Sequence, residues 1–383
     1  MDAGVEVERR STNLELFVDL AFVFAISQLS HLLAADLSPA GVAKAMLVAW
    51  TVWWVWSQFT WLGTAVDLER DGPTMAAFLV TIVPVLFMAS AIPDAYAGGG
   101  RRFGLAVLVA TLWSLVLQGL GLWGDPRTRT VWIQYASVAL IAPLVVGVGG
   151  LTSGATRVTL WCVALVIDVG GAVLAGRETS RSTGSWRINA SHFAERHALF
   201  VIIVLGEVLV AVGSAATGGR ITVTTGAAVV ASTALAAVLW WSYFGFVSGV
   251  SEERLRTDDE AERGHLARDL YSFGHFPLVA GIACVAVVAE AAVAHPDDRL
   301  GANELGLLVL ACVLMLGAYI TLRWRIQRRV RADRFVMLAA AVSVVVLAGP
   351  HLDGWVTVSL VALVLGVGQA AISHGFTTSN SAP

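Results

Sequence analysis

Long apolar segments recur along the whole chain, and short stretches rich in Gly, Pro and charged residues separate them. A helix needs about twenty consecutive apolar residues to cross the hydrocarbon core of a bilayer, and most of these segments reach that length. They are too long for single strands, and they lack the two-residue alternation of a membrane β-barrel. The pattern therefore predicts an all-α, polytopic bundle of about twelve transmembrane helices. The expected spans cover residues 14–35, 41–66, 73–93, 103–123, 130–150, 158–176, 195–215, 221–247, 271–294, 303–322, 335–350 and 354–374.

Composition also favours a membrane protein. Of the 383 residues, 57% are hydrophobic and only 14% are charged, and the mean hydropathy is +0.73. The chain has no basic domain, so we expect no nucleic-acid partner. Motifs for nucleotide binding, zinc proteases and serine hydrolases do not occur in a suitable context, and the cysteines follow no metal-binding spacing. We therefore expect no enzyme activity, no cofactor and no bound metal, with the lipid bilayer as a partner.

The distribution of basic residues predicts the orientation in the membrane. If the N-terminus lies in the cytoplasm, most of the 25 Lys and Arg residues fall in cytoplasmic loops, as the positive-inside rule requires. Both termini are therefore expected inside the cell. The densest basic run, Arg323–Arg334, either fixes this topology or also binds anionic lipid, at about 1 kcal/mol for each basic residue near the surface.

Similar motifs in the two halves of the chain predict an internal repeat. VWSQFTW at Val55–Trp61 in the second expected span resembles WWSYFGF at Trp240–Phe246 in the eighth. Six spans in each half would make the halves parallel repeats, related by an axis along the membrane normal. We expect a first six-helix half at 1–176, a cytoplasmic linker at 177–194, a second six-helix half at 195–376 and a polar tail at 377–383.

Two carboxylates interrupt the first expected span. Glu15 and Asp19 are four residues apart, so they share one face of a helix. A charged side chain at membrane depth costs at least a few kcal/mol, and such residues usually face the interior of the bundle. The pair either lies at the interface, where the helix dipole favours anions, or faces the interior and pairs with a cation or an arginine.

The seventh expected span carries further ionisable residues. It opens with His192, Glu195, Arg196 and His197, and Glu207 follows near the middle of the membrane. Arg196 and Glu207 are eleven residues apart, which places them on the same side of a helix. Glu207 is either a structural hydrogen-bonding group or an acid that handles protons or cations, and it is the strongest single candidate for a functional acid.

Further candidates lie in three other spans. Tyr271 and His275 are four residues apart in the ninth span, so we expect them to share a helix face. His275 either relays protons or lies in an interfacial aromatic belt. Asp168 in the sixth span and Glu290 in the ninth are secondary candidates, as acids within apolar segments. The tryptophans of Trp50–Trp61 are expected to pack in the bundle core, with a ligand-stacking site as the alternative.

Three motifs, in order along the chain, resemble a known family. They are LELFVDLAFVFAISQLSHLL at Leu14–Leu33, HFAERHALFVIIVLGE at His192–Glu207 and SFGHFPLVAGI at Ser272–Ile282. With them the sequence resembles the bacterial low temperature requirement A family over most of its length, although Val18 stands where that family often has a second Phe. The resemblance implies a multi-pass protein of the cell inner membrane, and the family name refers to a growth phenotype.

The first motif is also similar in spacing to the first helix of lysosomal and bacterial potassium channels built from six-helix units. Val18 replaces the serine of the FSD motif with which that helix begins. These features together predict transport of a small solute or ion, coupled to protons through the acids and histidines named above. The alternatives are a cation channel built from two six-helix units and a non-transporting sensor or assembly protein linked to low-temperature growth.

Overall fold

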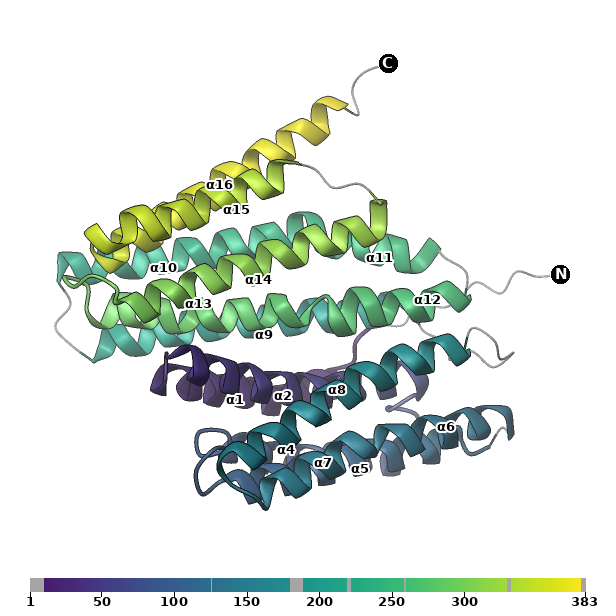
Figure 1. Cartoon of the computed structure of the whole chain (residues 1–383). Coiled ribbons are helices and arrows are strands. Elements are labelled where there is room, and N and C mark those ends of the chain that lie inside the picture. Colours follow the sequence, from purple (N-terminus) through teal and green to yellow (C-terminus); the bar gives the residue numbers. More distant parts are fainter. Residues whose placement is uncertain are drawn as a thin grey trace. The chain divides into compact units, whose positions relative to one another are not determined.

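The computed structural model describes residues 10–124, 126–179, 189–218, 222–257, 260–328 and 332–379. Within these ranges the chain forms helices and no strand, which confirms the all-α prediction (Figure 1). The expected linker and polar tail lie partly outside the described residues. The α-helices are α1 (Asn13–Ala35), α2 (Pro39–Ala65), α3 (Gly72–Leu79), α4 (Ile82–Ala91), α5 (Gly100–Leu122), α6 (Pro126–Ala139), α7 (Ile141–Gly150), α8 (Gly154–Thr179), α9 (Ala190–Thr217), α10 (Val223–Ser242), α11 (Ser248–Thr257), α12 (Glu260–Leu266), α13 (Phe276–Ala294), α14 (Ala302–Gln327), α15 (Ala332–Ser343) and α16 (Gly354–Ser379).

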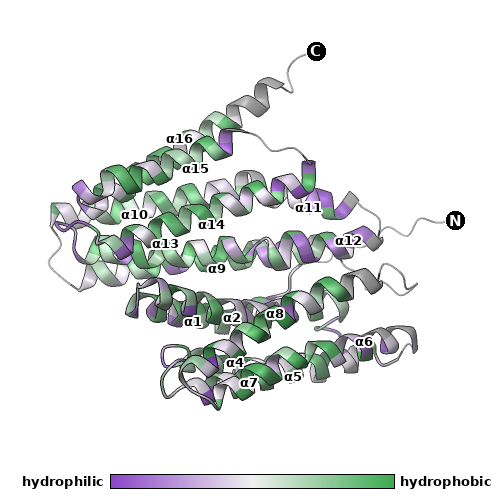
Figure 2. Cartoon of the chain, viewed as in Figure 1, coloured by the Kyte–Doolittle hydropathy of each residue, from purple (hydrophilic) through white to green (hydrophobic). Residues whose placement is uncertain are grey.

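Eleven segments of the described chain are long and apolar enough to cross a membrane. Helix α2 is not among them, although its 27 residues exceed the required length, because its tryptophans and polar residues lower its hydropathy. Figure 2 shows hydrophobic residues along most of each helix and hydrophilic residues gathered near helix ends, as in α11 and α12. The structure therefore agrees with a polytopic bundle of about twelve spans, while the orientation and the internal repeat remain predictions.

Prolines divide two of the expected spans into pairs of short helices. The span expected at 73–93 forms α3 and α4, with Pro84 in the first turn of α4. The span expected at 130–150 forms α6 and α7, with Pro143 near the start of α7. A proline removes one backbone hydrogen bond and its ring collides with the preceding turn, so the helix ends or bends there. Asp71 caps α3, because its side chain accepts a hydrogen bond of 2.8 Å from the backbone N–H of Thr74.

Three π-helical segments also interrupt the expected spans, at Tyr243–Val247, Ala267–Phe273 and Val344–Ala348. Such segments occur often near functional sites, because each one changes which side chains share a face. The ninth expected span begins in the second of these segments, and a turn at Gly274 and His275 separates it from α13. The four-residue spacing of Tyr271 and His275 therefore does not place them on one helix face, and that inference was wrong.

The chain divides into two compact units by its contacts. The first unit comprises Met1–Leu32, Val42–Phe200 and Glu252–Phe273, and the second comprises Leu33–Gly41, Val201–Ser251 and Gly274–Pro383. In the first unit α5 packs against α4 and α7, and α7 packs against α8. In the second unit α13 packs against α14, α10 against α16, and α15 against both α14 and α16. The units alternate along the chain, so the six-helix halves remain a prediction.

Helix α1 shows the polarity expected of a helix in lipid. Phe17 and Leu20 are 55% and 57% exposed, whereas the charged residues Glu15 and Asp19 are fully buried. A water-soluble helix has the opposite arrangement, with charged groups outside and aromatic groups inside. The carboxylate pair therefore faces the interior of the first unit, while its depth in the membrane remains a prediction.

Candidate functional site

The guanidinium of Arg196 on α9 joins both carboxylates of α1. Its Nη1 donates a hydrogen bond of 2.9 Å to Oε1 of Glu15, and its Nη2 donates one of 2.6 Å to Oδ1 of Asp19. All three residues are fully buried. Because Glu15 and Asp19 lie one helical turn apart, one planar guanidinium with a fork of N–H donors can reach both of them.

His192 extends this cluster by one turn of α9. Its Nε2 lies 2.9 Å from Oε2 and 3.1 Å from Oε1 of Glu15, and its ring is also fully buried. The backbone N–H of Thr12 donates a further hydrogen bond of 3.0 Å to Oε2 of Glu15. We call Glu15, Asp19, His192 and Arg196 the charge cluster. Its formal charge is −1 when His192 is neutral and zero when His192 carries a proton, so one proton balances it.

Several polar atoms of the charge cluster retain hydrogen-bonding capacity. Trp56 donates from Nε1 to Oδ1 of Asp19 at 3.0 Å. Within the described chain, Oδ2 of Asp19, Nδ1 of His192 and Nε of Arg196 are buried and have no hydrogen-bond partner. Buried polar atoms are usually paired, so each such exception calls for an explanation. A cluster that served only to hold helices together would be expected to use these atoms.

Aromatic side chains enclose the charge cluster within the first unit. The ring of His197 lies 4.9 Å from Trp56 and 5.0 Å from Tyr271, measured between ring centroids. Trp53 donates from Nε1 to the backbone carbonyl of Ser272 at 2.7 Å, and its ring lies 4.9 Å from that of Trp56. The tryptophans of α2 thus pack in the core, as expected. Their role as hydrogen-bond donors, to Asp19 and to Ser272, was not anticipated from the sequence.

Gly63 on α2 allows that helix to approach the charge cluster. A Cβ atom at this position would overlap Oε1 of Glu15 and would lie 3.4 Å from Cε1 of His192. Any side chain here would therefore displace the carboxylate from Arg196. The sequence contains many glycines in apolar segments, and nothing in its pattern singles out this one.

The structure places Glu195 and His197 beside the charge cluster rather than in it. Glu195 is half-buried and accepts a hydrogen bond of 2.7 Å at Oε2 from the backbone N–H of Ser11. His197 is fully buried, and its Nδ1 lies 2.9 Å from the carbonyl oxygen of Phe193. These contacts assign Glu195 to holding the N-terminal segment and His197 to the aromatic enclosure.

Two of the predicted residues, Glu207 and His275, belong to the second unit. Glu207 is buried on α9, and Nε2 of His275 lies 2.8 Å from the hydroxyl oxygen of Tyr243. Both His275 and Tyr243 are buried, so this pair forms a second buried polar contact. Tyr243 lies within the motif WWSYFGF and was not among the site residues predicted from the sequence. The secondary candidate Glu290 is half-buried on α13.

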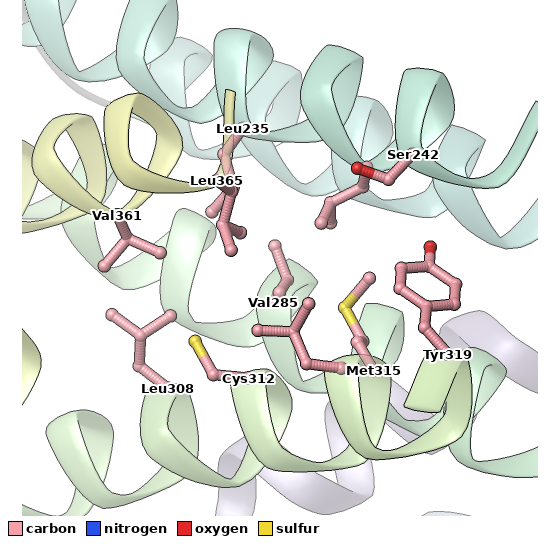
Figure 3. A pocket seen from close by; sticks show the side chains of 11 residues that line it. Leu235, Ser242, Val285, Leu308, Cys312, Met315, Tyr319, Val361 and Leu365 are labelled. Carbon is pink, nitrogen blue, oxygen red and sulfur yellow. The ribbon is translucent and has the colours of Figure 1, made fainter. Parts of the chain in front are cut away.

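A small cavity of about 20 Å³ lies in the second unit, between α10, α13, α14 and α16 (Figure 3). Its lining is mostly apolar, and the hydroxyl groups of Ser242 and Tyr319 are its oxygen-containing side chains. A cavity of this volume holds about one water molecule. No acidic residue lines it, so it is not a candidate site for a cation.

Comparisons with known proteins agree with the resemblance in the three motifs. Residues 10–369 match the family described as Bacterial low temperature requirement A protein (LtrA). The chain is also 32% identical to the uncharacterized protein RA0937 of Rhizobium meliloti (strain 1021) over 290 residues, which cover 74% of this chain and 69% of that protein. No solved structure matches the chain. The family match spans nearly the whole sequence, and the chain therefore belongs to the bacterial low temperature requirement A family of multi-pass membrane proteins.

Proposed function

We propose that this protein transports a small solute or ion across the cell inner membrane and couples that movement to protons at the charge cluster. The observation that carries the proposal is the burial of Glu15, Asp19, His192 and Arg196 among helices of membrane-spanning length. Ionisable residues inside the membrane are costly, and those of proton-coupled transporters commonly form such groups. The proposed cargo is a small solute, a cation or the proton itself.

The composition of the charge cluster favours a proton-handling role over a purely structural one. Apolar side chains of similar volume often hold helices together as well as a buried ion pair does, or better. The charge cluster instead keeps an excess carboxylate and a free acceptor oxygen on Asp19. Uptake of one proton balances the charge of this cluster, so the cluster has a protonated and a deprotonated state. Proton-coupled transport requires alternation between two such states.

The described conformation is closed around these groups. Glu15, Asp19, His192 and Arg196 have no exposed surface, so exchange with either side of the membrane requires movement of the surrounding aromatic side chains. The π-helical segment Ala267–Phe273 carries Tyr271 and Ser272 of that enclosure. We propose that its rearrangement opens the charge cluster, and that the basic run Arg323–Arg334 contacts anionic lipid at the cytoplasmic surface.

A flux assay with the purified full-length protein in liposomes tests the proposal. A trapped pH-sensitive dye reports proton movement while gradients of pH, sodium, potassium and a panel of small solutes are imposed. We expect proton-dependent flux with the unmodified protein, loss of most of it with Asp19→Asn, and normal flux with Glu290→Gln. Glu290→Gln is the matched control, since Glu290 is a half-buried acid of a predicted span that lies outside the charge cluster.

Two results would contradict the proposal. The first is absence of flux for every ion and solute with a protein that is folded and correctly inserted, which would favour the sensor or assembly role. The second is unchanged proton-dependent flux with Asp19→Asn, which would show that the charge cluster is structural.

A further inference from the structure

A second cavity, of about 10 Å³, lies within the first unit and is lined by a single ionisable residue, Asp168. The volume is close to that of one water molecule or one small ion. Helices α2, α5, α6, α7 and α8 contribute its walls. The lining residues with oxygen in their side chains are Thr51, Gln58, Thr111 and Asp168.

Asp168 is a half-buried acid, and it has no countercharge in the part of the chain that the structure describes. It lies in the interior of α8, in a segment that is long and apolar enough to cross the membrane. Within the described residues it forms no salt bridge, in contrast to Glu15 and Asp19, which share Arg196. Its carboxylate interacts with the indole of Trp50 and with the side chain of Tyr135, which are both neutral groups. A carboxylate in such a place must either take up a proton or bind a cation.

Oxygen atoms of neutral side chains line the same cavity. The hydroxyl of Thr51 donates a hydrogen bond of 3.0 Å to the carbonyl of Leu47, so its oxygen remains an acceptor. Thr111 places a hydroxyl in the lining, and Gln58 places an amide there whose oxygen also accepts a hydrogen bond from the hydroxyl of Tyr135. Carboxylate, hydroxyl and amide oxygens are the ligands that hard cations prefer. The cavity thus combines one negative charge with several neutral oxygen ligands.

A stack of aromatic rings supports one wall of the cavity. Trp54 lines the cavity and stacks on Trp50, with ring centroids 5.3 Å apart and an angle of 16° between the rings. Phe273 stacks on both rings, at centroid distances of 6.2 and 5.9 Å. This three-ring stack holds the indole of Trp54 in a fixed orientation beside the cavity.

We propose that this cavity binds one monovalent cation, such as sodium, potassium or ammonium, with Asp168 as the charged ligand and Thr51, Gln58 and Thr111 as neutral ligands. One carboxylate balances one positive charge, whereas a divalent cation would leave an uncompensated charge in a medium of low dielectric constant. The site is separate from the charge cluster. Cation binding here can therefore be established or refuted independently of the proposed transport.

Equilibrium binding to the purified full-length protein in detergent tests this site. Radiolabelled sodium or rubidium, the latter in place of potassium, is titrated while choline chloride keeps the ionic strength constant. We expect one saturable site per chain, competition by unlabelled ammonium, and no competition by calcium at equal ionic strength. Asp168→Asn should abolish the binding, and Glu290→Gln, which changes an acid outside the cavity, should leave it unchanged.

Thr111→Val provides a variant that keeps the shape of the side chain and removes one ligand oxygen. It should weaken the binding several-fold, and it decides the question if Asp168→Asn does not fold. Absence of saturable binding of every monovalent cation to the folded protein would overturn the proposal. Unchanged affinity in folded Asp168→Asn or Thr111→Val would overturn it as well. Normal binding without any flux would instead refute the proposed transport and leave this site in place.

Discussion

Replacing Arg196 by methionine should destabilise the protein strongly and in a pH-dependent way. Arg196 makes two ionic hydrogen bonds, of 2.9 Å to Glu15 and 2.6 Å to Asp19, and all three side chains are essentially unexposed. Removing one partner of a buried ion pair costs about 3–5 kcal/mol, because the remaining charge is left uncompensated. Here two carboxylates lose their common partner, so we expect a loss at the upper end of this range. Lowering the pH should reduce the loss, since protonation neutralises the carboxylates.

Denaturation in mixed micelles at several pH values measures this effect. Arg157→Met is the matched control, because Arg157 is also buried but donates to the carbonyl oxygens of Ala95 and Ala97, at 2.8 and 3.0 Å, and not to a carboxylate. Its replacement should cost about 1–3 kcal/mol for the lost hydrogen bonds, with little dependence on pH.

A compensated variant separates charge from packing. The triple change Glu15→Gln, Asp19→Asn and Arg196→Met removes every charge of the trio and should regain about half or more of the stability lost by Arg196→Met. Stability near that of the unmodified protein in Arg196→Met would refute the electrostatic reasoning. So would a triple variant no more stable than the single one, or a loss that did not shrink at low pH.

Two further predictions concern single positions outside this trio. Gly63→Ala should lower the free energy of unfolding by about 1–3 kcal/mol, because the added Cβ would overlap Glu15. Gly206→Ala is the control and should be neutral or stabilising, because its Cβ meets no atom within 4 Å. Thermal unfolding of the two variants measures the difference. Hydrogen bonds from Thr74 lower the pKa of Asp71 from 3.8 to about 2, so the cap of α3 should persist above pH 4 and weaken as the pH falls towards 2. Carboxyl NMR of selectively labelled protein would show this titration, and an ordinary pKa for Asp71 would contradict it.

The sequence predicted the features that depend on local regularity. Helix lengths follow from the apolar segments, and the inward direction of Glu15 and Asp19 follows from their spacing and the cost of exposing charge to lipid. Arg196 was expected to share a side of its helix with Glu207, and the structure adds its bridge to both carboxylates of α1. Arg196 and Glu15 are 181 positions apart, and a periodic pattern in the sequence gives no information about contacts between such distant residues.

Other features depend on side-chain geometry and were missed for that reason. Trp56 was expected only to fill the core, yet its Nε1 donates to Asp19. Tyr243 pairs with His275. The motif that contains Tyr243 predicted only an internal repeat. The sequence predicts regular helix from Tyr271 to His275, and this prediction is wrong because the π-helical segment and the turn before Pro277 leave little trace in hydropathy.

The bridge between α1 and α9 also constrains how the protein is made. During synthesis α1 leaves the ribosome long before Arg196 does, since the partners are separated by 181 residues. Until then its two acids have no arginine to pair with. An acidic residue in an inserting helix disfavours entry through the translocon, by about 2.5–3.5 kcal/mol at the helix centre and by less near its ends, and Glu15 and Asp19 lie in the first two turns of α1. The nascent first helix therefore bears this cost until α9 is made. A polypeptide released before residue 196 would lack the arginine that binds Glu15 and Asp19 in its first helix.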